Sequence, residues 1–141
     1  MFFETFFFSR VVKAVLDAMD GVSQTSLIIL EDMARNGDTK EKYQCLESLI
    51  DYNQKLLETL NVSHPALEDI VKLSKQNGDL HAKLTGAGGG GFAFILIPPM
   101  VTERTVAKLK ETLTDRGYTC WESELGVNGV QVQRQNREHT R

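Results

Sequence analysis

The sequence predicts an α+β domain in which the helices come first and an antiparallel sheet follows. Through the first half of the chain, apolar residues recur at three- and four-residue steps, the period of an amphipathic helix. After Gly78 the period changes to two, because Leu80, Ala82 and Leu84 alternate with polar residues as in a half-buried strand. A chain of 141 residues has room for one such domain, with helices packed against the sheet.

The composition is that of an ordinary globular protein. Hydrophobic residues make up 41% of the chain, charged residues 25%, and the formal net charge is −3, so nothing favours binding to nucleic acid. Cys45 and Cys120 lie far apart and form no CxxC pair, and His64, His81 and His139 are scattered. The sequence therefore predicts no disulfide framework and no zinc site, and we treat each histidine as a surface or hydrogen-bonded residue.

The first ten residues contain five phenylalanines but do not resemble a targeting signal. Glu4 interrupts the apolar run and Arg10 follows it, whereas a secretory signal has a basic start and a longer apolar stretch. The run is also too short to cross a bilayer. We expect residues 1–10 to be a hydrophobic start that packs on the domain, or a start site inside a longer gene, and we expect a cytoplasmic protein without membrane contact.

Three helices are expected in the first half of the chain. Residues 11–33 carry apolar side chains at helical spacing, although Gly21 and the polar patch at residues 23–26 are expected to bend or split that helix. Residues 43–60 show the most regular apolar stripe. A third helix is expected over residues 65–78, because its proline suits the first turn and its last glycine suits the stop.

The second half is expected to hold the sheet. Residues 80–85 predict the first strand, and residues 92–97 form an unbroken apolar run that suits a central strand. A helix over residues 102–117 is expected next, with Thr102 as its cap and Gly117 as its stop.

The end of the chain is expected to add two more strands and a tail. Residues 118–125 predict a strand, and the Asn-Gly pair at 128–129 predicts a hairpin before Val130 and Val132, which alternate with glutamines. Residues 134–141 are expected to be a polar, frayed tail. We find no repeat or linker that would divide the domain.

The residues between the first two predicted strands form the strongest functional signal. Residues 86–91 hold five glycines in six positions, more than a hairpin requires. Glycine admits positive φ and lacks Cβ, so consecutive N–H groups can line a concavity that favours an anion. The default ligand is phosphate, and the alternative is a flexible hairpin tip.

Other phosphate-binding loops do not fit this glycine run. Gly86 and Gly91 have the separation of a GxxxxGK[ST] loop, but Phe92 and Ala93 replace its lysine and hydroxyl residue. The GxGxxG spacing is present, yet a strand follows it where the dinucleotide-binding motif needs a helix. A protein kinase is excluded because the chain has no DFG, HRD or VAIK motif.

The segment KLTGAGGGG at residues 83–91 resembles the third conserved motif of the GHMP small-molecule kinases, in the form found in mevalonate kinases. Residues 43–65, YQCLESLIDYNQKLLETLNVSHP, are similar to the helical region that precedes this motif in animal mevalonate kinases. ESELGVNGV at residues 122–130 is similar to their closing strands. The resemblance extends over residues 11–132, and the glycine loop is its most specific element.

The resemblance implies a ferredoxin-like GHMP kinase C-terminal domain over residues 11–133, with an antiparallel sheet packed against helices. It implies transfer of the γ-phosphate of ATP to the 5-hydroxyl of mevalonate, a step of isoprenoid and sterol biosynthesis that uses Mg²⁺. Carried over by motif, the loop residues Gly86, Ala87, Gly88, Gly89, Gly90 and Gly91 lie at the phosphate site, and Lys83 and Thr85 lie on the substrate side.

This sequence also departs from the family pattern. The family's PxxxGLGSSAA loop, its magnesium-binding residues and its aspartate and lysine pair have no match here, and the first strand of the C-terminal domain is missing. We therefore assign no catalytic residue and no metal ligand, and expect no catalysis and no tight ATP binding by this chain alone. A homodimer through the first helix is one expected assembly. The alternatives are a non-catalytic interaction domain with the same fold and a fragment of another GHMP kinase, such as phosphomevalonate or homoserine kinase.

Lys83 and the acidic residues of the second helix also have explanations that involve no catalytic or binding role. A lysine on a half-exposed strand is usually solvated, which is the alternative for Lys83. The acidic residues of the second helix, Glu41, Glu47, Asp51 and Glu58, are expected to form a solvated face rather than a catalytic carboxylate pair.

Overall fold

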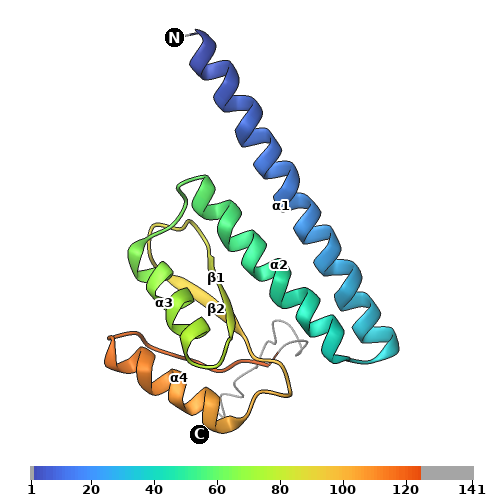
Figure 1. Ribbon diagram of the computed structural model, residues 1–141, viewed down its shortest axis with the longest axis vertical. Coiled ribbons are helices and arrows are strands. Elements are labelled where there is room, and N and C mark those ends of the chain that lie inside the picture. Colours follow the sequence, from blue (N-terminus) through green and yellow to red (C-terminus); the bar gives the residue numbers. More distant parts are fainter. Residues whose placement is uncertain (1, 125–141) are drawn as a thin grey trace, which may run out of the picture.

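The computed structural model describes the backbone of residues 2–124 and the side chains from Ser9 onward. Three helices, a pair of antiparallel strands and a fourth helix follow one another along the described chain, so the α+β arrangement predicted from the sequence is confirmed (Figure 1). In these residues the elements are α1 (Phe2–Asn36), α2 (Lys40–Thr59), α3 (Pro65–Gln76), β1 (His81–Thr85), β2 (Phe92–Leu96) and α4 (Glu103–Asp115).

Helix α1 is a single continuous helix of 35 residues, so the expectation of a bend or split near Gly21 was wrong. The hydroxyls of the polar patch find partners within this helix. Ser23, Thr25 and Ser26 each donate to a carbonyl one turn earlier, at 3.0, 2.8 and 2.8 Å, so these polar side chains are satisfied within the helix. The helix also begins at Phe2 and passes through the phenylalanine-rich start without a break.

Helices α1 and α2 pack side by side through one apolar cluster. Met33 of α1, Leu46 and Ile50 of α2 and Leu96 of β2 form its buried part. An ion pair joins the end of α1 to the start of α2: the Lys42 ammonium of α2 lies 2.6 Å from the Asp32 carboxylate of α1. The cluster joins the helical half of the chain to the sheet.

Only part of α1 is covered, because α2 has 20 residues against its 35. In Figure 1 the first part of α1 extends beyond the end of α2. The apolar residues within 11–33 were expected to mark one face of an amphipathic helix, yet Val11, Val12, Leu16, Leu27 and Leu30 among them are exposed. Their spacing fits a helix, but the neighbouring helix covers a narrower stripe. Within residues 2–124 we find no helix long and apolar enough to span a membrane.

The second apolar cluster lies between the sheet and helices α3 and α4. Leu73 of α3, Leu80 before β1, and Leu109 and Leu113 of α4 are buried together, and Ile95 of β2 packs against them. The carboxylate of Asp69, in α3, accepts hydrogen bonds from Arg116 at 3.3 Å and from the Tyr118 hydroxyl at 3.2 Å. These bonds tie the start of α3 to the chain after α4.

The sheet of the described residues has two strands, β1 and β2, which pair antiparallel from His81 with Leu96 to Thr85 with Phe92. One expectation about it was wrong, because residues 118–124 do not form a strand. In the described part of the chain β1 is the one neighbour of β2, so the central place expected for β2 stays a prediction. The predicted hairpin at 126–129, Val130, Val132 and the polar tail lie outside the described residues.

A buried glutamine connects α2 to the sheet. Gln54 is 3% exposed; its side-chain oxygen accepts the Leu84 N–H at 2.9 Å, and its side-chain nitrogen donates to Glu58 at 2.8 Å. The Leu84 N–H belongs to the edge of β1 that faces away from β2, and it is buried under α2. A buried N–H without a partner costs free energy, so Gln54 supplies the partner that a third strand would otherwise provide.

Replacing Gln54 by methionine keeps the shape of the side chain and removes its hydrogen bonds. We expect Gln54→Met to lower the free energy of unfolding by about 1–3 kcal/mol, because the Leu84 N–H stays buried without an acceptor. Urea unfolding measures the change. Gln44→Met is the matched control, since Gln44 is exposed on the same helix and should change the value by less than about 0.5 kcal/mol. Equal losses in the two variants would contradict the role of Gln54.

Candidate functional site

The glycine loop, residues 86–91, joins the paired ends of β1 and β2. Thr85 and Phe92 lie directly opposite each other, so the loop leaves and re-enters the sheet at one point. Four of its residues have positive φ: Gly86 at 81°, Gly88 at 74°, Gly90 at 115° and Gly91 at 106°. Residues that carry a side chain rarely adopt these backbone angles, which explains why the loop is built from glycine.

The middle of the loop is packed against the connection between α2 and α3. Gly88 is buried, and a Cβ added there would lie 2.7 Å from Val62 Cγ1 and 2.9 Å from the Val62 carbonyl oxygen. Both distances are shorter than van der Waals contact permits. The loop therefore rests on Val62, and the absence of a side chain at position 88 permits that approach.

The rest of the loop is open. A Cβ added at Gly86, Gly89, Gly90 or Gly91 would meet no atom within 4 Å. Within residues 2–124 no hydrogen bond is made by the backbone N–H groups of residues 86–91. The loop is thus fixed at Gly88 and carries free donors on both sides of that point. Such a loop can bind the oxygens of an anion such as phosphate.

Thr85 and Lys83, the two residues predicted on the substrate side, differ in their exposure and contacts. Thr85 is exposed at the end of β1, at the entrance to the loop. The Lys83 ammonium donates to the Leu84 carbonyl oxygen at 2.8 Å and lies 5.4 Å from the centre of the Phe94 ring. Burial lowers the pKa of Lys83, because the charged amine loses part of its hydration. Lys83 is therefore engaged within the sheet rather than freely solvated.

A polar cluster of α2, α3 and β1 was not predicted from the sequence. His81 Nδ1 lies 2.9 Å from the Asp51 carboxylate, and His81 Nε2 lies 3.1 Å from the Lys75 ammonium. Because an ammonium has only donors, Nε2 accepts and the ring proton belongs on Nδ1. Lys75 also pairs with Asp79 at 2.9 Å. The cluster links three elements, so its arrangement is structural.

The expectation that Asp51 lies on a solvated face was therefore wrong, because His81 and Lys75 approach it from two other elements. The expectation that His81 is a hydrogen-bonded residue agrees with its contact to Lys75. Gln54 was also missed, although the sequence held a signal. It follows Leu46 and Ile50 at four-residue steps, so a polar side chain stands on the buried stripe of a helix.

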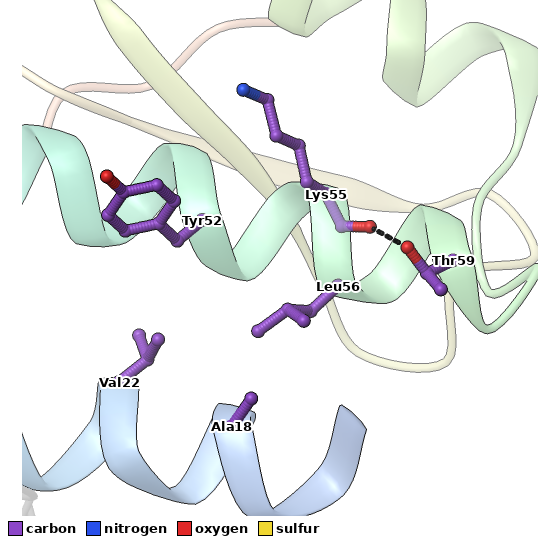
Figure 2. A pocket seen from close by; sticks show the side chains of 6 residues that line it. All are labelled: Ala18, Val22, Tyr52, Lys55, Leu56 and Thr59. Carbon is purple, nitrogen blue, oxygen red and sulfur yellow. Dashed lines mark hydrogen bonds between the residues drawn. The ribbon is translucent and has the colours of Figure 1, made fainter. Parts of the chain in front are cut away.

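Two grooves of the described residues lie between α1 and α2 and include no residue of the glycine loop. One groove of about 320 Å³ lies between α1 and α2 and is lined by six residues, which Figure 2 shows: Ala18, Val22, Tyr52, Lys55, Leu56 and Thr59. Val22 and Ala18 point from α1 toward α2, while Thr59 donates to the Lys55 carbonyl at 2.8 Å (Figure 2). The lining is mostly apolar, and no set of polar groups converges on it. A second groove, of about 430 Å³, lies between the same helices.

No cluster of His, Cys, Asp or Glu that could hold a metal ion is found among the residues that the structure describes. The loop itself contains no carboxylate. The candidate site is therefore a set of backbone donors.

Two alanine substitutions separate the packed part of the loop from its open part. Gly88→Ala should lower the free energy of unfolding by about 1–3 kcal/mol, because the new methyl group collides with Val62 at an unfavourable φ. Gly89→Ala should change it by less than about 1 kcal/mol, in either direction, since the space is open and φ is not positive. Chemical unfolding compares the two variants; similar values would contradict the packing at Gly88.

The lowered pKa of Lys83 predicts a pH dependence of stability. Between that pKa and the ordinary value of 10.5, the unfolded chain binds more protons at this residue than the folded chain, so stability from this group rises with pH. Lys83→Met should remove this contribution. Unfolding curves of the two proteins across the alkaline range measure the difference, and parallel pH dependences would contradict it.

Comparison with known proteins supports the resemblance seen in the sequence. Residues 29–117 match the family model described as GHMP kinases C terminal. The chain is 38% identical to mouse mevalonate kinase over 123 residues, which is 87% of this chain and 31% of the mouse protein. It is 39% and 36% identical to the bovine and human mevalonate kinases over 125 residues, 89% of this chain and 31% of each relative.

The chain thus spans less than a third of the length of these relatives. The matched region begins within α1, ends at the turn after α4 and contains the whole glycine loop. This chain belongs to the GHMP kinase family, of which it carries the C-terminal domain.

Proposed function

We propose that this chain is the C-terminal part of a mevalonate kinase, and that its glycine loop holds phosphate oxygens while ATP phosphorylates mevalonate to 5-phosphomevalonate. One observation carries the proposal: the loop is fixed against Val62 at Gly88, and its N–H groups have no hydrogen-bond partner within residues 2–124. The similarity to mevalonate kinases over most of this chain supports the choice of mevalonate as substrate.

The loop acts in this proposal through backbone dipoles. Phosphoryl transfer spreads negative charge over the oxygens of the transferred group, and donors that are already in position stabilise that charge without reorganising. Glycine at positions 86, 89, 90 and 91 keeps the approach to those donors clear of side chains. Thr85, exposed at the loop entrance, lies on the side from which the acceptor alcohol comes.

The other parts of the reaction are assigned to the complete enzyme. The residues present fit the oxygens of ATP or product, because they offer donors, but they do not fit Mg²⁺, because the loop has no carboxylate. When bound, Mg²⁺ neutralises charge on the phosphates. We propose that this chain does not bind ATP tightly and is inactive without the part of the relatives that it does not span.

The cellular setting belongs to the same proposal. A mevalonate kinase would place the chain in isoprenoid and sterol biosynthesis, in the cytoplasm. A homodimer is supported by the exposed apolar residues of α1, among them Val12, Leu16 and Leu27, which would be covered by a second helix.

A chimera tests the proposed function. In mouse mevalonate kinase, the 123 residues that match this chain are replaced by the corresponding residues of this chain. We expect ATP-dependent phosphorylation of mevalonate by the chimera. Gly89→Asp in the chimera should lower kcat/KM by at least about tenfold, because a carboxylate in the open part of the loop repels the phosphate oxygens.

Gly21→Asp is the control for the added charge, because Gly21 lies on α1, far along the chain from the loop, and its added Cβ meets no atom within 4 Å. It should keep the activity of the chimera. A folded chimera without activity, or equal losses with the two aspartates, would favour the alternative, a non-catalytic interaction domain. Mevalonate phosphorylation by this chain alone, well above a no-protein control, would contradict its proposed inactivity.

A further inference from the structure

The exit of the glycine loop lacks the contact that fixes its centre. Gly88 rests on Val62, but a Cβ added at Gly89, Gly90 or Gly91 would meet no atom within 4 Å. Consecutive glycines have wide backbone freedom, and the N–H groups of these three have no hydrogen-bond partner within residues 2–124. Donors stabilise a developing charge best when they are already in position. The exit therefore needs a support of its own if its donors are to act on phosphate.

Phe92 is the first residue after the loop that carries a side chain. It pairs with Thr85 at the last position of the two-stranded sheet, where strands tend to fray. Its side chain is 62% exposed, so the core does little to hold it. Its ring instead contacts Trp121: the ring centres are 6.2 Å apart and the planes are tilted by 49°. Aromatic rings attract each other at separations of about 4.5–7 Å, so this contact holds Phe92 from outside the sheet.

The chain around Trp121 is anchored on both sides of the ring. Tyr118 and Cys120, which come before it, pack against the second apolar cluster. Glu122, which comes after it, pairs with Lys110 of α4. The Trp121 side chain is itself 72% exposed, so its place is set by these neighbours rather than by its own burial.

We propose that Trp121 is a positioning residue for the glycine loop, which it holds through Phe92. The loop then has two supports: Val62 at its centre and the aromatic pair at its exit. One support comes from the connection between α2 and α3, and the other comes from the segment after α4. Between them, residues 89–91 keep their open surroundings but lose much of their freedom to move.

The alternative is that the two rings meet only because both are apolar. In that case the contact stabilises the fold and has no particular effect on the loop. Two observations favour positioning: the contact lies directly after the last glycine, and both rings stay mostly exposed, so they bury little apolar surface. The catalytic part of this inference rests on the proposed function, because a fixed exit aids the reaction only if the loop binds phosphate. The effect on loop motion does not.

NMR relaxation of the backbone amides tests the inference on the full chain. We expect order parameters of about 0.8 for residues 89–91, and Trp121→Ala should lower them to below about 0.6, because the exit loses its support. Trp121→Phe keeps a ring and should retain most of the order. The matched control, Tyr52→Ala, removes another exposed ring, which is 59% exposed and lines the groove between α1 and α2. It should leave the loop unchanged.

The chimera with mouse mevalonate kinase tests the effect on the reaction. Trp121→Ala in the chimera should lower kcat at least about threefold and change KM for mevalonate less than about twofold, because positioned donors act on charge that develops in the transition state. Trp121→Phe should restore most of kcat. A ring with a merely structural role would lower the melting temperature but leave kcat of the folded enzyme unchanged.

Three outcomes would overturn the inference. Order parameters at residues 89–91 that do not respond to Trp121→Ala would mean that the ring does not hold the loop. Equal losses with Trp121→Ala and Tyr52→Ala would assign the effect to general destabilisation. A loop that loosens while kcat stays the same would overturn the part in catalysis. An inactive chimera would overturn the proposed function alone, since the NMR comparison decides the positioning of the loop without any activity.

Discussion

The side chain of Gln54 is the connection on which the rest of the fold depends. It carries a hydrogen bond from the buried surface of α2 to the backbone of β1, one residue before the strand reaches Thr85. Without an acceptor there, the Leu84 N–H would be buried and unpaired, and the end of β1 would lose its fixed distance from α2. Because the glycine loop continues directly from this end, the same bond helps to position the candidate phosphate site.

The loop combines a fixed centre with open flanks. The contact between Gly88 and Val62 holds the centre against the connection from α2 to α3, while Gly86 and Gly89–Gly91 have no side chain near them. Glycine at these positions weakens the fold, since the unfolded chain gains freedom. In return the loop gains donors that an anion can reach. A side chain at position 88 would disturb the fixed centre, and a side chain at position 89 would occupy the open space beside the donors.

The sheet shows how an edge can be closed without a strand. Side chains of α2 and β1 satisfy the outer groups of Leu84, whereas Ala93 and Ile95 have no such partners within residues 2–124.

Local pattern determined much of this protein. The order of the described elements, Pro65 in the first turn of α3, Thr102 as the cap of α4 and the glycine loop between two paired strands all followed from residue type and spacing. The continuity of α1, the exposure of Leu27 and Leu30, the pairing of Asp51 with His81 and the place of Gln54 did not. These depend on which neighbour covers a given face, and that neighbour comes from a distant part of the chain. Periodicity marks the apolar side of an element, but only the tertiary structure decides how much of it is buried, and therefore which polar groups must find partners.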